Sequence, residues 1–173
     1  MAALVLLAAL VWPNVAGRRE RAQLDYVGSQ VASLLSLARS AAMSTGRRHR
    51  CAFTEGGAKL RVESEADPLD RPEDFQPLKA EWGQLNLADE NVRCVLVDLM
   101  GLDKVIRTRE RDFLDRELPA QLFEPIMFGP DGRCDSAVIL LSGPSPRALR
   151  LELNGLTGQV RIQEQWDVEA KSE

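Results

Sequence analysis

The sequence predicts an α+β fold, with a long N-terminal α-helical stem packed on a C-terminal antiparallel β-sheet head. Three observations lead to this fold class. An apolar run opens the chain at residues 1–12, a helix-spaced apolar stripe follows it, and residues 137–163 alternate apolar and polar side chains between glycine-containing turns. The first two patterns are typical of a continuous helix, and the third is typical of antiparallel strands with one wet face.

The opening run is apolar on every side, so it requires lipid or protein around it. We assign to this buried helix start the following residues: Leu4, Val5, Leu6, Leu7, Leu10, Val11, Trp12 and Pro13. A helix of residues 1–12 reaches about 18 Å, whereas a hydrocarbon core of about 30 Å needs about 20 residues. Two interpretations stay open: a clipped signal sequence, or the later part of a longer membrane helix. No basic residue precedes the run, as a signal peptide requires, and helical periodicity continues beyond Pro13. Both points favour the membrane helix.

The next segment carries one apolar stripe at alternating steps of three and four residues. Its members are Leu24, Val27, Val31, Leu34, Ala38 and Ala41. This spacing places them on one face of a helix, which we expect to pack against the head. We expect Leu24, Val27, Val31, Leu34 and Ala38 to form that contact. The helix is predicted to run over residues 1–45, with a kink or local break at Pro13 and an end at Gly46.

The first part of the head reads as a hairpin followed by a long polar excursion. Residues 50–54 and 58–63 are predicted strands around a Glu-Gly-Gly turn. Residues 64–91 are polar and contain three prolines (Pro68, Pro72 and Pro77), which predicts mostly loop. Residues 92–97 are apolar on both faces, which predicts a central strand. Residues 101–118 fit a surface helix or an irregular excursion.

The second part of the head reads as an antiparallel meander. A Pro-Asp-Gly turn at residues 130–132 precedes strands predicted at residues 137–141 and 147–153, and a further turn at 155–158 precedes alternation over residues 160–163. We therefore divide the chain into a partial transmembrane or filament-core helix (1–16), an amphipathic stem helix (17–46), a β-rich head (47–166) and a frayed tail (167–173).

The composition excludes several functional classes. The net charge of −4 disfavours a dedicated nucleic-acid binder, and a lone histidine, His49, rules out multi-histidine sites. Cys51, Cys94 and Cys134 lack zinc-ligand spacing, and they fit either buried thiols or one disulfide with a thiol left over. No P-loop, nucleophile-elbow or zinc-protease motif occurs. We expect no enzyme activity, no cofactor, no metal and no small-molecule substrate.

Two charged clusters have simple interpretations. Asp67, Asp70, Glu73 and Asp74 fit a solvated acidic loop, since their spacing lacks a calcium-loop pattern. Arg47, Arg48 and Arg50 follow the predicted helix end, where cations are favourable. The alternative for the arginines is a DNA-contacting patch, although no aromatic residues for base stacking are interleaved with them.

Several segments in order resemble the type IV pilin-like proteins, and within them the GspH/FimT-type minor pseudopilins. The matching segments are residues 2–15 (later part of the hydrophobic helix), 37–47 (stem-to-head junction), Trp82 with Leu85, Leu87 and Val92 (mid-domain), and 128–132 and 154–160 (last strands and turns). The family's processing signature, a Gly before a Phe-Thr-Leu-Ile-Glu-like start that is cut and methylated, does not occur in this sequence.

The resemblance implies assembly instead of catalysis. It implies a structural subunit of a type II secretion pseudopilus, anchored by a single-pass helix in the inner membrane with its head in the periplasm. Its partners would be the other major and minor pseudopilins and the secretion machinery, near the filament tip, in support of protein export. A DNA-binding or adhesive minor pilin of a type IV pilus is the first alternative. A secreted β-domain behind a clipped signal peptide is the second.

Overall fold

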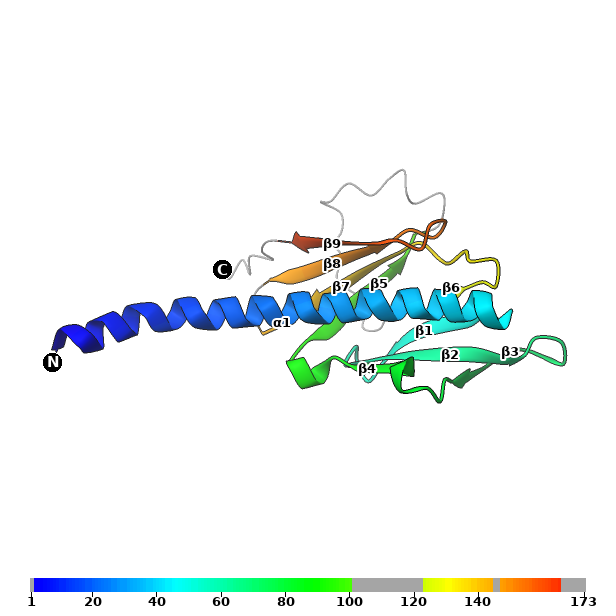
Figure 1. Ribbon diagram of the computed structural model, residues 1–173, viewed down its shortest axis with the longest axis horizontal. Coiled ribbons are helices and arrows are strands. Elements are labelled where there is room, and N and C mark those ends of the chain that lie inside the picture. The colour runs from blue at the N-terminus through cyan, green and yellow to red at the C-terminus, as the bar shows by residue number, and fades with distance from the viewer. Residues whose placement is uncertain (1, 101–122, 145–146, 166–173) are drawn as a thin grey trace, which may run out of the picture.

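The stem is one long helix. The computed structural model describes residues 2–100, 123–144 and 147–165, and for residues 2–18 it describes the backbone only. Helix α1 spans Ala2–Thr45, and it continues through Pro13 without the local break that we had allowed for (Figure 1). It ends as predicted, because Gly46 takes a positive φ of 66° and its N–H donates to the Ala42 carbonyl at 3.1 Å.

The head consists of two antiparallel sheets, which confirms the predicted α+β fold. The first contains β1 (His49–Thr54), β2 (Lys59–Asp67), β3 (Arg71–Pro77) and β6 (Ile126–Phe128) in the order β3-β2-β1-β6, and β4 (Gln84–Asn86) also pairs with β2. The second contains β5 (Arg93–Leu99), β7 (Ala137–Ser142), β8 (Ala148–Leu153) and β9 (Val160–Gln165) in the order β5-β7-β8-β9. Two short 3-10 helices, η1 (Glu81–Gly83) and η2 (Ala88–Glu90), flank β4.

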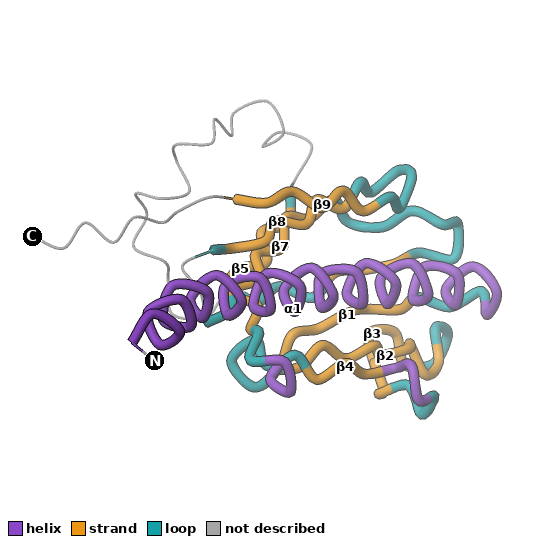
Figure 2. Tube along the Cα trace, turned by 60° about the vertical axis from the view of Figure 1, so that its left-hand side comes forward, coloured by secondary structure: helices purple, strands orange, loops and turns teal. Residues whose placement is uncertain are grey.

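Helix α1 lies along both sheets. Figure 2 shows β1 to β4 on one side of the helix and β5, β7, β8 and β9 on the other. The helix contacts β1, β2 and β6 of the first sheet and β7 and β8 of the second. Buried residues of the helix and of both sheets form one hydrophobic core. In β8, Leu149, Leu151 and Leu153 are buried, as their alternation predicted.

Two predictions about the head are wrong, the first for residues 64–91 and the second for strand β5. Residues 64–91 are not mostly loop, because β2 extends to Asp67 and β3 and β4 follow it. The prolines are tolerated because β3 is an edge strand, where Pro72 and Pro77 need not donate to a neighbour on both sides. Residues 101–118 and the tail 167–173 lie outside the described residues.

Strand β5 is also not central, since it stands at the end of its sheet. Other segments cover its free edge, whereas Val95 on one of its faces is 45% exposed. The N–H of Cys94 donates to the Gly57 carbonyl at 2.9 Å, and Val97 forms an isolated bridge with Phe123. The β1–β2 turn therefore closes part of the edge that a neighbouring strand would otherwise occupy.

The same turn offers a matched test of this contact. Gly56 and Gly57 both have a positive φ, of 63° and 83°. A Cβ at Gly57 would lie 1.9 Å from the Cys94 carbonyl oxygen, whereas a Cβ at Gly56 would meet nothing within 4 Å. We predict that Gly56→Ala costs about 1 kcal/mol and Gly57→Ala at least about 3 kcal/mol. Scanning calorimetry in a mild detergent would check this, and equal losses would contradict the close approach.

Candidate functional site

The inward face of the stem lies inside the head. Leu24, Val27, Val31, Leu34 and Ala38 are all buried, Val31 and Ala38 completely. The sequence pattern missed Leu35 and Ala42, which are also buried, while Ala41 is only half-buried. The buried stripe is wider than predicted because the helix must cover two sheets.

One close approach sets how the helix seats on the second sheet. A Cβ at Gly28 would lie 2.3 Å from Cδ2 of Leu149 on β8. Because glycine lacks this atom, the helix backbone can lie directly against the strand.

Arg39 joins the stem to two turns of the head. Its Nε donates to the Gly132 carbonyl at 2.7 Å. Gly132 and Gly158 have positive φ values of 80° and 68°, and a Cβ at Gly158 would lie 2.4 Å from Cδ of Arg39. Both turns therefore close on one half-buried arginine. Three of the segments that resemble minor pseudopilins, residues 37–47, 128–132 and 154–160, meet at this contact, which sequence reasoning did not identify.

The basic cluster is engaged within the head. Arg48 donates from Nε and Nη2 to the two carboxylate oxygens of Glu65 at 3.0 and 2.5 Å, and Arg50 Nε donates to Glu63 at 2.5 Å. Their guanidinium carbons lie 5.9 and 4.5 Å from the centre of the Phe75 ring. Arg47 donates to the Ala66 carbonyl at 2.9 Å. We name Arg48, Arg50, Glu63, Glu65 and Phe75 the hairpin clip, because they join β1 to both strands of the β2–β3 hairpin.

These contacts weigh against the arginines as a DNA patch. Phosphate binding requires free cationic donors, whereas Arg48 and Arg50 already pair with carboxylates. His49, between them, is 1% exposed and lies with its Nδ1 3.1 Å from the Arg47 carbonyl oxygen. It is therefore part of the core and does not face a ligand.

The clip shifts the titration of its buried carboxylate. Hydrogen bonds from Arg48 hold the pKa of Glu65 below its usual value, against the opposing effect of burial, and the N–H of Glu73 adds to the lowering. The same pairing raises the pKa of Arg48. At the hairpin turn, the N–H groups of Asp70 and Leu69 lower the pKa of Asp67.

The three cysteines are free thiols. Cys51 pairs with Ile126 on one edge of β6, and Cys134 bridges to Phe128 on the other. Two strand spacings put their Cα atoms at least about 9 to 10 Å apart, beyond the reach of a disulfide. Burial raises the pKa of all three thiols, to about 12 for Cys94 and about 11 for Cys134. Within the described ranges, no group of three or more His, Cys, Asp or Glu residues is placed to hold a metal.

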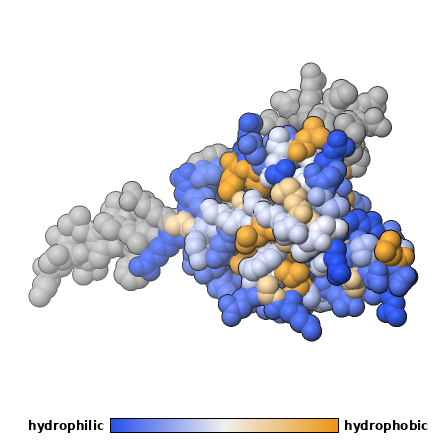
Figure 3. All heavy atoms as spheres, turned by 45° about the vertical axis from the view of Figure 1, so that its right-hand side comes forward, coloured by the Kyte–Doolittle hydropathy of each residue, from blue (hydrophilic) through white to orange (hydrophobic). Residues whose placement is uncertain are grey.

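Between Tyr26 and Gly46 the outward face of the stem is exposed and carries no charge. Arg39 is the only charged residue between Tyr26 and Gly46, and its side chain turns toward the head. The exposed large side chains on this face are Tyr26, Leu37 and Met43, at 55%, 46% and 46%. The same face carries small residues: Ser29, Ser33, Ser36, Ser40 and Ser44. In Figure 3 a pale band with apolar patches crosses the centre of the visible face, and hydrophilic residues surround it.

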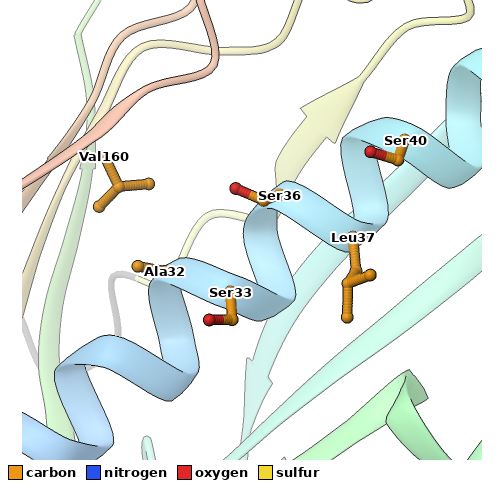
Figure 4. A pocket seen from close by; sticks show the side chains of 6 residues that line it. All are labelled: Ala32, Ser33, Ser36, Leu37, Ser40 and Val160. Atoms are coloured by element: carbon orange, nitrogen blue, oxygen red, sulfur yellow. The ribbon is translucent and has the colours of Figure 1, made fainter.

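A shallow groove runs between this face and β9. Its lining residues are Ala32, Ser33, Ser36, Leu37, Ser40 and Val160 (Figure 4). Val160 pairs with buried Leu153, but β9 is the edge strand of its sheet, and Ile162 on it is 40% exposed. Ser33 bonds back to the Ser29 carbonyl, whereas the hydroxyls of Ser36 and Ser40 have no acceptor or donor among the described residues. The groove is therefore lined by small and uncharged side chains, and the Ser36 and Ser40 hydroxyls face solvent.

The helix start projects beyond the head, as Figure 1 shows. The side chains assigned to it from sequence, at positions 4–7 and 10–13, lie outside the described side chains. Within the described part of the chain, no helix combines the length and apolar character needed to cross a membrane.

The fold is similar to that of two solved structures. No protein-family model matches the chain, and no curated protein matches it. Two solved structures of EpsH, the minor pseudopilin of the Vibrio cholerae type 2 secretion system, match its fold. One shares 12% identity at a TM-score of 0.52, over 82% of this chain and 97% of that chain. The other shares 14% identity at a TM-score of 0.53, over 85% and 97%. The predicted pseudopilin-like fold is confirmed.

The hairpin clip predicts how stability depends on pH. The folded-state pKa of Glu65 is lowered, so its contribution is complete above an unfolded-state pKa of about 4.3 and is lost as pH falls through the folded value. We predict that Glu65→Gln lowers the melting temperature at neutral pH. The variant should also lose less stability than the wild type between about pH 6 and about pH 3. Melting curves that fall in parallel would contradict the pairing.

Proposed function

We propose that the chain is a structural minor pseudopilin of a type II secretion pseudopilus. It is a subunit without catalytic activity or cofactor. Its helix anchors it in the inner membrane, its head lies in the periplasm, and it assembles near the filament tip with other major and minor pseudopilins to support protein export. The pseudopilin-like fold and the matches to EpsH support this proposal.

The single observation that carries the proposal is the uncharged outward face of α1. Charged residues make up 28% of the chain, yet none points outward between Tyr26 and Gly46. A helix face that stays in water is normally rich in charge, whereas the centre of an interface is depleted of it. Small residues at Ala32, Ser36 and Ser40, four positions apart, let a second helix approach closely. A subunit whose stem packs against other stems needs such a face.

The DNA-binding alternative has weaker support. The arginines that suggested it pair with Glu63 and Glu65 or bond to a backbone carbonyl. No contact in the described part of the chain favours an adhesive or DNA-binding tip over a filament subunit.

A charge on the outward face tests the proposal. Ser36→Glu adds a carboxylate to an exposed position, so the head should fold with an unchanged melting temperature. A buried, unpaired charge at a stem–stem contact costs several kcal/mol, so we predict loss of export to the medium and of co-purification with other pseudopilins.

Lys79→Glu is the matched control, since Lys79 is exposed and belongs to the segment between β3 and η1, outside α1. It should leave export and co-purification intact. Normal export by the Ser36→Glu variant would show that this face is not an assembly surface.

A further inference from the structure

The β2–β3 hairpin is larger than the core requires. Strand β3 contributes no buried side chain, and the hairpin turn lies beyond the C-terminal end of α1, at the pole opposite the N-terminus (Figure 1). In contrast, β2 supplies Leu60 and Val62 to the core from its other half. The outer half of the hairpin therefore adds little hydrophobic stability to the head.

This outer half is nevertheless held firmly. The hairpin clip pairs Glu65, which is 1% exposed, with Arg48, and packs Phe75 of β3 under Arg48 and Arg50. Glu65 is buried in this ion pair, whereas the Arg48 side chain is 40% exposed. Such a pair is a poor source of net stability, because the lost hydration of the carboxylate offsets much of the attraction. What such a clip does provide is a fixed geometry, and here it fixes the direction in which the hairpin points.

The tip of the hairpin presents one apolar side chain. Asp67 Oδ1 accepts from the N–H groups of Leu69 and Asp70 at 3.0 and 3.1 Å, which orders the turn. Leu69 is 91% exposed, more than any other large apolar residue in the described part of the chain. The charged residues next to it in sequence are acidic except for Arg71: Asp67, Asp70, Glu73 and Asp74. Arg47, which donates to the Ala66 carbonyl, lies beside the base of this turn.

The tip, and not the strand edge, is the surface that a partner can use. Strand addition needs backbone donors along the edge of β3, and Pro72 and Pro77 remove two of them. Exposed Leu69 with its acidic surround instead fits an apolar socket rimmed by Lys or Arg, since burying a leucine supplies affinity and opposite charges supply orientation.

We propose that the β2–β3 tip docks through Leu69 into a basic-rimmed apolar socket on the head of a neighbouring pilin-like subunit. This inference rests on the proposed function. Subunits that are anchored through parallel stems all point this pole away from the membrane. The tip then meets the subunit that lies further along the filament, and the acidic surround of Leu69 selects which subunit that is.

The test is co-purification of the affinity-tagged full-length chain from detergent-solubilised membranes of its host, with the other pilin-like subunits quantified by mass spectrometry. We expect Leu69→Ser to lower the recovery of one such subunit about tenfold or more, which is the loss of one buried leucine contact. Leu156→Ser is the control, because Leu156 is 75% exposed on the β8–β9 turn. It should leave recovery unchanged, and neither variant should alter the melting temperature.

The outcomes separate this inference from the proposed function. Wild-type recovery of every subunit by the Leu69→Ser variant, or equal losses in both variants, would overturn the tip contact alone. Absence of all pilin-like subunits from the wild-type eluate would overturn the proposed function together with this inference. Recovery that falls at high salt in the wild type, and less so in Asp70→Asn, would support the basic rim.

Discussion

The structure depends on one helix that serves as the shared core of two sheets. Neither sheet has another layer on its inner face in the described residues, and α1 supplies that layer to both. Glycine at position 28 lets the helix seat against β8, and Arg39 holds the turns of β6–β7 and β8–β9 at the far end. Because folding of the head requires the stem, the stem cannot leave the head in order to assemble.

This constraint explains how the surface is divided. The two sheets cover the inward face of α1, so assembly must use the outward face. Between Tyr26 and Gly46 this face has small residues and no charge. Charged residues lie elsewhere on the surface. Arg48 and Arg50, which follow the C-terminal end of the helix, pair with Glu65 and Glu63 in the hairpin clip. The molecule thus offers two different surfaces, an uncharged helix face between Tyr26 and Gly46 and an acidic, leucine-bearing tip at one pole.

The helix and the C-terminal meander were predictable because their hydrophobic periods are regular. Gly46 and the turns at 130–132 and 155–158 marked their limits. Strand β3 was not predicted, because its prolines indicate a loop although an edge strand tolerates them. Strand β5 was predicted to be central, because its apolar pattern does not reveal that it is an edge strand covered by another segment. Pairing of Arg48 and Arg50 with Glu65 and Glu63 depends on strand register, which spacing alone does not reveal. The stretch from Tyr26 to Gly46, with Arg39 as its one charged residue, was visible in the sequence and would have indicated the outward face.

Hydrogen exchange in the Leu35→Ala variant tests the shared core most directly. Leu35 is 1% exposed on the inward face of α1, and its truncation costs about 2 to 4 kcal/mol. If both sheets depend on the helix, the protection of the Leu60 and Val62 amides in β2 and of the Leu149 and Leu151 amides in β8 will fall by the same free energy. A loss of protection confined to one sheet would show that the sheets are stable independently and would contradict the account.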